Sequence, residues 1–275
     1  MSGILYVVGT PIGNLGDMSQ RAINTLDEVD FIAAEDTRVT LKLLNHFNIK
    51  KPMISYFEHN KLERGEIICS RIESGENCAI VTDAGMPCIS DPGELLVKQC
   101  AERGIKTVVI PGASAVVSAL AISGLPTGRF TFEGFLSTSK KSRTEHLEQL
   151  KNEKRTMIFY EAPHKLAATL KDMYNTFGAR RISIVRELTK IHEEVIRTDL
   201  QTAAQEYADG SLKGEIVLVI EGAADEENEK EITLEQATKI ALEYMEQGLS
   251  ASESAKRTAK ETGFKKNEIY KTLID

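Results

Sequence analysis

The sequence has few cysteines, and their spacing matches no common cysteine motif. Its 275 residues contain four cysteines and no tryptophan. The cysteines, at 69, 78, 88 and 100, lie 9 to 12 residues apart and include no Cys-x-x-Cys pair. We therefore predict reduced thiols in a cytoplasmic protein. The five histidines, at 46, 59, 146, 164 and 192, show no pairing at metal-ligand spacing, so no metal site is predicted.

An excess of positive charge is also missing. The chain has 34 lysines and arginines against 41 aspartates and glutamates, which gives a net charge of −7. This balance argues against a protein that coats nucleic acid without specificity, but it leaves room for a local basic face.

No segment is predicted to cross a membrane. The apolar N-terminus lacks a basic region and an Ala-x-Ala site, so we expect a first strand there and no signal peptide. Residues 107–128 carry no charge and would be long enough to span a bilayer. Pro111, Gly112, Gly124 and Pro126 interrupt that run, which favours a strand, a turn and a buried helix.

Three nucleotide and nucleophile motifs are absent. The loop at residues 9–19 follows the first predicted strand, but its glycines are spaced Gly-x-x-x-Gly-x-x-Gly, not Gly-x-Gly-x-x-Gly. No Gly-Lys-Ser/Thr follows, and no Gly-x-Ser-x-Gly occurs. The sequence thus disfavours a nicotinamide site, an ATP site and a nucleophile elbow.

What the sequence does contain is a regular alternation of short apolar strands and helices, which predicts an α/β fold with a mainly parallel sheet covered on both faces. Strands are expected at 4–9, 30–36, 53–57, 78–83, 106–112, 130–135, 155–162, 180–187, 193–200 and 214–222. Helices are expected at 19–29, 40–47, 61–75, 94–104, 113–123, 142–152, 164–178 and 201–210.

This pattern predicts two consecutive α/β domains, at 1–115 and 116–224. Residues 225–231 hold five acids and one base and are expected to be an acidic linker. Residues 232–275 are expected to form a small helical domain with helices at 233–248, 250–263 and 265–274. Ser250 and Glu253 are spaced as a capping box. This tail resembles a helix-turn-helix and is locally basic, so it is either a small packing bundle or a nucleic-acid contact.

Polar and glycine-containing loops follow the predicted strands. In an open parallel sheet, the loops at the carboxyl ends of the strands line the ligand crevice. Asp83 ends the fourth strand and can accept hydrogen bonds, and Gly85 lets the backbone approach a ligand. Asp91 is interpreted as the N-cap of the next helix, with Pro92 at its first position. Further polar residues at strand ends are Glu161, His164, Arg186, Glu187 and Lys190.

Eight segments together resemble the small-subunit ribosomal RNA 2′-O-methyltransferase I family of the tetrapyrrole methylase superfamily. They read VGTPIGNLGDMSQRA, AAEDTRVTLKLL, EHN, TDAGMPCISDPG, PGASAVVSAL, FEGFL, FYEAPHKL and RELTK, and are spread over residues 1–222. The C-terminal sequence resembles the small helical domain that many members carry.

The resemblance implies S-adenosylmethionine as methyl donor, bound between two α/β domains of a homodimer. It implies as acceptor the 2′-hydroxyl of a cytidine ribose in 16S rRNA, at the decoding centre of the small ribosomal subunit. Asp83 matches an acidic donor contact of the superfamily, although Asp-Ala-Gly replaces the usual Gly-Asp-Pro. The expected donor-binding residues are Pro11, Asp83, Ala84, Gly85, Met86, Ser114, Ala115, Tyr160 and Glu215.

A ribose hydroxyl is a weak nucleophile, so a base that takes its proton should assist an in-line methyl transfer. The sequence does not identify that base. The candidate catalytic residues are Glu35, Asp36, Arg38, His164, Glu187 and Lys190. The candidate substrate-binding residues are Asn14, His59, Arg186, Lys265 and Lys266, and arginines among these sets can hold phosphates.

Three other functions remain open at this point. A methyltransferase acting on a tetrapyrrole or another small molecule would use the same fold without RNA contacts. A non-catalytic RNA-binding protein of ribosome assembly would keep the donor pocket without turnover. A nicotinamide oxidoreductase would bind a dinucleotide in place of S-adenosylmethionine.

Overall fold

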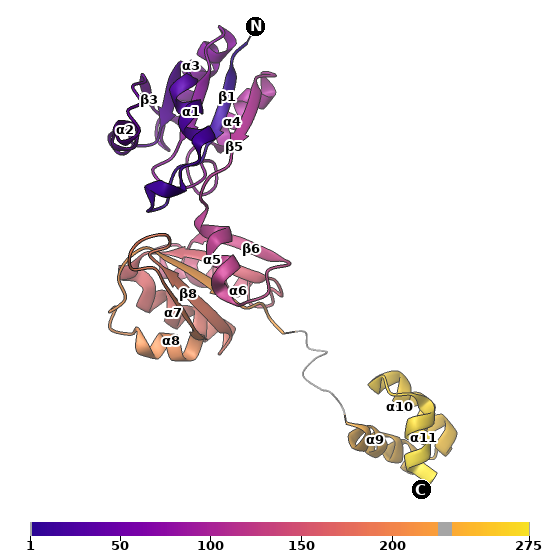
Figure 1. The fold of residues 1–275 in the computed structure, drawn as a ribbon. Helices are drawn as coiled ribbons and strands as arrows, with labels where there is room; N and C mark the ends of the chain where they lie inside the picture. Colours follow the sequence, from indigo (N-terminus) through magenta and orange to yellow (C-terminus); the bar gives the residue numbers. More distant parts are fainter. Residues whose placement is uncertain (1, 225–232, 275) are drawn as a thin grey trace. The chain divides into compact units, whose positions relative to one another are not determined.

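The structure is a computed structural model that describes residues 2–224 and 233–274. The described chain divides between Ala223 and Ala224 into two compact units. The first unit holds two five-stranded sheets, and the second holds three helices (Figure 1). The predicted α/β fold class with C-terminal helices is thereby confirmed. The predicted acidic linker, 225–231, lies outside the described residues.

The first sheet is parallel and has the strand order β3-β2-β4-β1-β5. Its strands are β1 (Ile4–Val8), β2 (Phe31–Ala34), β3 (Met53–Ser55), β4 (Cys78–Val81) and β5 (Lys106–Ile110). Helices α1 (Gln20–Glu28) and α2 (Thr37–His46) share one hydrophobic core with the sheet, and α3 (Lys61–Glu73) and α4 (Glu94–Glu102) share another. All residues of β2 and β4 are buried, as expected for central strands covered on both faces.

The second sheet is mixed and has the order β6-β7-β10-β8-β9. Its strands are β6 (Phe130–Phe135), β7 (Thr156–Glu161), β8 (Arg181–Arg186), β9 (Glu194–Asp199) and β10 (Ile216–Ile220). Helix α5 (Ala115–Ser123) packs in one core of this sheet. Helices α6 (Lys140–Gln149), α7 (Pro163–Phe177) and α8 (Leu200–Glu206) pack in the other.

The mainly parallel arrangement predicted from the alternation is wrong for the second sheet. β6 and β7 are parallel, but β7–β10, β10–β8 and β8–β9 are antiparallel pairs. The chain passes from β8 to β9 through residues 187–193 without a helix. A connection this short cannot carry a strand back to run parallel, so the two strands form a hairpin.

The start of α2 and the cap of α4 differ from the predictions. α2 begins three residues earlier than expected, because the Asp36 side chain caps it by accepting a hydrogen bond from the Arg38 backbone N–H at 2.8 Å. The predicted N-cap role of Asp91 is wrong, since α4 begins at Glu94 and Gly93 occupies the N-cap with φ +136°. Ser90 also has a positive φ of 64°. The backbone thus stays irregular through this loop, and the Asp91 side chain does not cap the helix.

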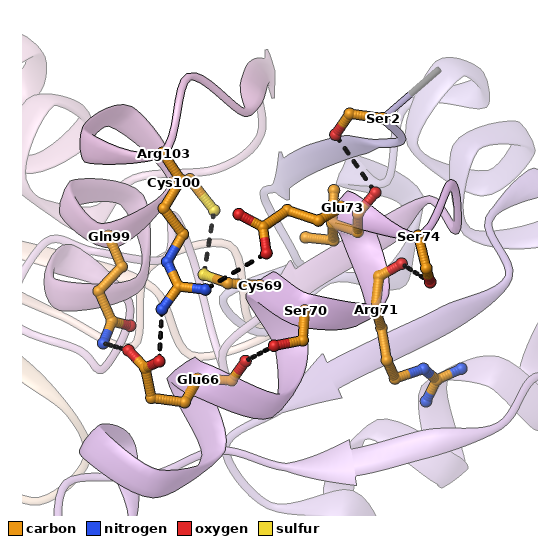
Figure 2. Close-up of polar contacts among 11 residues, drawn as sticks. Ser2, Glu66, Cys69, Ser70, Arg71, Glu73, Ser74, Gln99, Cys100 and Arg103 are labelled. Carbon is orange, nitrogen blue, oxygen red and sulfur yellow. Dashed lines mark hydrogen bonds and ion pairs between the residues drawn. The ribbon is translucent and has the colours of Figure 1, made fainter.

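A polar network joins α3 to α4 beside two buried cysteines (Figure 2). The sulfur atoms of Cys69 and Cys100 are 3.8 Å apart and both side chains are buried. Arg103 pairs with Glu66 and Glu73 next to them. All four cysteines are free thiols in the structure, and burial is the main cause that raises the pKa of each of them.

The second unit is a three-helix bundle with a small core. It consists of α9 (Leu234–Glu246), α10 (Ala251–Thr262) and α11 (Lys266–Ile274), packed around Ala237, Ala241, Ala255 and Ile269. Ser250 caps α10 as predicted, but the Glu253 side chain accepts from the Ser250 hydroxyl and not from its backbone, so the predicted capping box is half formed. Gly263 ends α10 in the left-handed conformation.

The charge-free run 107–128 forms most of β5 and all of α5. Throughout the two described ranges, no helix combines the length and apolar character that a bilayer span requires.

A close backbone approach in the first sheet predicts a stability effect. A Cβ on Gly112, just after β5, would lie 2.8 Å from the Cα and carbonyl carbon of Gly9, just after β1. We expect Gly112→Ala to lower the free energy of unfolding by about 1–3 kcal/mol, because backbone atoms cannot yield to the added methyl group. Urea unfolding monitored by circular dichroism measures this. Gly128→Ala is the control, since a Cβ there meets no heavy atom within 4 Å; equal midpoints for the two variants would contradict the prediction.

Candidate functional site

The loop that follows β1 (residues 9–19) and the loop that follows β4 (residues 82–93) meet at the carboxyl edge of the first sheet. The place where they meet, at Thr10 and Gly85, is here called the crossing. β1 leads to α1 in one core and β4 leads towards α4 in the other, so the two chains diverge here, as at the ligand crevice of open α/β sheets. An isolated antiparallel bridge joins them: Thr10 N–H donates to Gly85 O at 2.9 Å, and Gly85 N–H donates to Thr10 O at 3.2 Å. Gly85 has φ +86°, a conformation that suits glycine.

One side of this crossing faces a cavity of about 350 Å³, here called the first cavity. It is lined from both halves of the first unit, by loops of the first sheet and by strands β7, β8 and β10 of the second. Seven of the nine predicted donor-binding residues line it: Ala84, Gly85, Met86, Ser114, Ala115, Tyr160 and Glu215. The other two, Pro11 and Asp83, lie elsewhere on the crossing.

The walls of the first cavity are mostly apolar and aromatic, with a few polar groups. The Tyr160 ring lies against Phe135 with 5.4 Å between centroids, and burial raises the pKa of the Tyr160 hydroxyl to about 12. Ser114 precedes α5 but its side chain makes no capping hydrogen bond. The Ser114 side chain thus accepts from none of the first backbone N–H groups of α5 at the cavity wall, and groups of this kind attract anions.

Asp91 is the acidic residue that the sequence interpretation placed wrongly. Its side chain lines the first cavity and is partly buried. Burial, followed by the negative charge of Glu35, raises the pKa of the Asp91 carboxyl to about 6. Burial and Glu35 also raise the pKa of Asp83. A positively charged ligand near the crossing would therefore stabilise the charged form of these carboxylates.

Glu35, Asp36 and Arg38 lie together with Asp83 near the end of β2. The Thr82 hydroxyl donates to Glu35 at 2.5 Å, and the Asp36 N–H donates to Asp83 at 3.1 Å. Arg38 pairs with Asp36 at 2.6 Å. This hydrogen bond from Arg38 lowers the pKa of Asp36 to about 2, so Asp36 is a poor proton acceptor.

The other side of the crossing faces a second cavity of about 280 Å³, here called the second cavity. Its walls are the loops after β1 and β4 and one side of α2. Pro11 and Asp83 line it. Residues 10–13 and 82–85 therefore lie between the two cavities. Some of these residues line the first cavity and the others line the second.

Lys190 stands next to both cavities. Its ammonium donates to Glu187 at 2.9 Å and to Glu215, a residue of the first cavity, at 3.0 Å. A Cβ on Gly13, a residue of the second cavity, would lie 2.6 Å from Lys190 Cγ. Burial lowers the pKa of Lys190, but the hydrogen bonds to the two glutamates outweigh it and raise the pKa overall. Glu187 and Lys190, predicted together from sequence, thus form one ion-pair cluster with Glu215.

The remaining predicted residues lie apart from these clusters or have other partners. Arg186 pairs with Glu194 at 2.8 Å. Asn14 caps the short 3-10 turn η1 (Leu15–Asp17), and His59 is exposed with its ring 6.1 Å from that of Phe57. His164 is exposed in the first turn of α7 and lines neither cavity. Lys265 and Lys266 are exposed in the second unit, beside the start of α11.

Sequence reasoning missed several residues that line the cavities. In the first cavity these include Ile12, Asp91, Phe135, Leu188 and Val217. Asp91 carried a signal, since it shares a loop with Asp83, but its resemblance to a helix cap concealed it. The apolar residues carried none, because strand and loop hydrophobics look alike whether they face a core or a ligand. Among the described residues, no group of three or more His, Cys, Asp and Glu is arranged to hold a metal ion.

Structural comparison gives the fold of the first unit. The methyltransferase CobJ aligns with a TM-score of 0.60 and 18% identity, covering 81% of this chain and 95% of that one. A uroporphyrin-III C-methyl transferase from Thermus thermophilus, complexed with S-adenyl homocysteine, aligns with a TM-score of 0.54 and 14% identity, covering 80% and 97%. At these identities, the similarity shows the fold alone.

Sequence comparison is more specific. The family Tetrapyrrole (Corrin/Porphyrin) Methylases matches residues 4–204. Proteins named ribosomal RNA small subunit methyltransferase I match at 47% identity in Synechocystis sp., over 99% of this chain and 98% of the relative, and at 46% in Halalkalibacterium halodurans, over 98% and 93%. The Thermotoga maritima protein of that name matches at 46% over 80% of this chain and 99% of its own length. The chain therefore belongs to the tetrapyrrole methylase family, in its ribosomal RNA small subunit methyltransferase I group.

Proposed function

We propose that the protein transfers a methyl group from S-adenosylmethionine to the 2′-hydroxyl of a cytidine ribose in 16S rRNA, at the decoding centre of the small subunit. The observation that carries this proposal is the 47% identity over nearly the whole chain to a protein named for that class of RNA substrate. The proposal includes a homodimer acting in the cytoplasm.

The residues of the first cavity fit the donor. Its volume of about 350 Å³ and its largely apolar lining suit a small nucleoside ligand. The start of α5 at Ser114 offers backbone N–H groups to a carboxylate. Asp91 and Glu215 supply negative charge for a ligand with an ammonium and a sulfonium group. Apolar side chains such as Ile12 and Leu188 offer a surface against which a flat purine ring can pack.

When bound, the donor supplies an electrophilic methyl group. The protein has to hold the acceptor hydroxyl in line with the methyl group. It also has to place a general base where the base can take the proton of that hydroxyl. Lys190 is suited to positioning, because it contacts Glu215 of the first cavity and Gly13 of the second. As an ammonium held by two glutamates it is not a base. Asp83 suits proton transfer better than Asp36, since its pKa is raised while that of Asp36 is lowered.

The decisive experiment is a methyl-transfer assay. Radiolabelled S-adenosylmethionine is mixed with the protein and with small subunits that lack their own modifications, and the RNA is then hydrolysed with alkali. Label in an alkali-resistant dinucleotide supports ribose 2′-O-methylation. Label on a base contradicts the reaction proposed, and donor binding without any label favours a tetrapyrrole substrate or a non-catalytic role.

The raised pKa of Asp91 predicts pH-dependent donor binding. Because protonation of Asp91 below about pH 6 removes a negative charge from the cavity, the affinity for positively charged S-adenosylmethionine should fall as the pH drops through that value. Asp91→Asn should weaken binding at neutral pH and flatten the profile. Isothermal titration calorimetry from about pH 5 to 8 measures both. Glu94→Gln, an exposed carboxylate outside the cavity, should keep the wild-type profile; a wild-type profile in Asp91→Asn would contradict the assignment.

The ion-pair cluster around Lys190 predicts that a substitution there lowers turnover without weakening donor binding. Lys190→Met removes the ammonium that joins the two cavity walls, and we expect kcat to fall about a hundredfold. The dissociation constant of S-adenosylmethionine should change little. Glu187→Gln should give a smaller loss in the same direction. His164→Ala is the control and should retain activity, because His164 is exposed and lines neither cavity. Full activity in Lys190→Met would remove Lys190 from the mechanism.

The second unit predicts a separate contribution to substrate binding. The Thermotoga maritima relative matches over 220 residues, about the length of the first unit, and 99% of its own length. A chain shortened after Ala224 should therefore bind the donor normally. It should bind small subunits about tenfold more weakly and with a reduced salt dependence, since Lys265, Lys266 and Lys271 are lost. Filter binding at several salt concentrations tests this. Equal loss of donor and subunit binding, or loss of neither, would argue that the tail only packs.

A further inference from the structure

The second cavity adjoins the first. The two cavities are separated only by residues 10–13 and 82–85. A ligand in the second cavity would therefore lie close to a ligand in the first. The volume of the second cavity, about 280 Å³, exceeds that of a nucleobase. Lys190 packs against its Gly13 wall while bonding Glu215 of the first cavity. A ligand here would be next to the group proposed to position the acceptor.

The lining has the character of a base-binding pocket. Leu15 and Val39 contribute apolar side chains that are 43% and 38% exposed, so they are available to a flat ring. Asp83 also lines this cavity, so the carboxylate suited to proton transfer from the ribose borders it. Thr40 lines the cavity, is 3% exposed, and has a hydroxyl without a hydrogen-bond partner in the described structure. A buried hydroxyl without a partner is costly unless a ligand satisfies it.

A row of basic residues runs along α2 beside this cavity. Arg38, Lys42 and His46 are spaced four residues apart and lie on one side of the helix, and all three are exposed. Lys42 and His46 also line the cavity and take part in no ion pair within the described ranges. Arg38 is also paired with Asp36, so in a protein with net charge −7 it is mainly Lys42 and His46 that offer a local attraction for phosphates.

We propose that the second cavity receives a base of the RNA acceptor strand while the α2 row Arg38–Lys42–His46 holds the neighbouring phosphates. This inference rests on the proposed RNA substrate and adds where that substrate binds. The apolar walls and the Thr40 hydroxyl take the base. The donor stays on the other side of the crossing, and the ribose between base and phosphate reaches the boundary of the two cavities.

Filling the cavity tests the proposal. Val39→Trp places a large side chain at the wall, whereas Leu41→Trp adds the same side chain two residues along α2, where Leu41 is 47% exposed and lines neither cavity. We expect Val39→Trp to raise KM for small subunits about tenfold or more with an unchanged dissociation constant for S-adenosylmethionine. Leu41→Trp should match the wild type. Wild-type KM in Val39→Trp, or equal effects of the two variants, would overturn the proposal.

Two further variants do not depend on Val39→Trp folding well. Thr40→Val keeps the shape but removes the hydroxyl, so it should leave the melting temperature unchanged or higher and raise KM several-fold. Lys42→Glu should lower the affinity for small subunits and reduce the dependence of that affinity on salt concentration. Lys106→Glu is its control, because Lys106 is exposed at the opposite, amino-terminal end of β5. Wild-type KM in both Thr40→Val and Lys42→Glu would overturn the proposal.

The outcomes distinguish this inference from the proposed function. If wild-type protein neither binds nor methylates small subunits, the proposed function itself fails. If the wild type methylates them and Val39→Trp, Thr40→Val and Lys42→Glu do so with unchanged KM, the function stands and the second cavity is not the base site.

Discussion

The crossing of the β1 and β4 loops is the constraint on which the rest of the site depends. Two backbone hydrogen bonds between Thr10 and Gly85 hold the loops together, and Gly9 lies against Gly112 at a separation that leaves no room for a Cβ. Because the crossing is made of backbone, it stays narrow enough to have a cavity on each side. Larger residues here would force the strand ends apart and merge or close the two spaces.

Electrostatics then gives the two sides different characters. The first cavity presents Asp91 together with Glu215, which is paired with Lys190, and this local acidity suits a positively charged donor. Along α2, the second cavity presents Lys42 and His46, which suit phosphates. Lys190 is balanced between Glu187 and Glu215, so its charge is held in place and not left to solvent. On the proposed function, an acidic chain can in this way attract both a cation and a polyanion, because the two ligands would lie on different local surfaces.

The family fold explains why this division is possible. In an α/β sheet the binding residues lie on loops, which can change while the strands keep their register. Relatives by fold alone, such as the uroporphyrin-III C-methyl transferase, share the sheets at 14% identity. The α2 row and the residues around it illustrate this. They lie on a helix of the first sheet and not on the strands that build the crossing.

The sequence by itself determined the ten strands, the order of helices between them and the strand-end location of the site. These follow from local hydrophobic patterns and from turn residues, which neighbouring residues carry. It also placed Glu187 beside Lys190, since they are three residues apart.

Only the tertiary structure decided the rest. Asp91 became a cavity residue because positive φ angles at Ser90 and Gly93 separate it from the helix it was expected to cap. The antiparallel pairs of the second sheet, the meeting of Gly13 with Lys190, and the second cavity itself all join residues far apart in the chain. Such contacts depend on how whole elements pack, and a single sequence records no physical trace of which loops will come to share a wall.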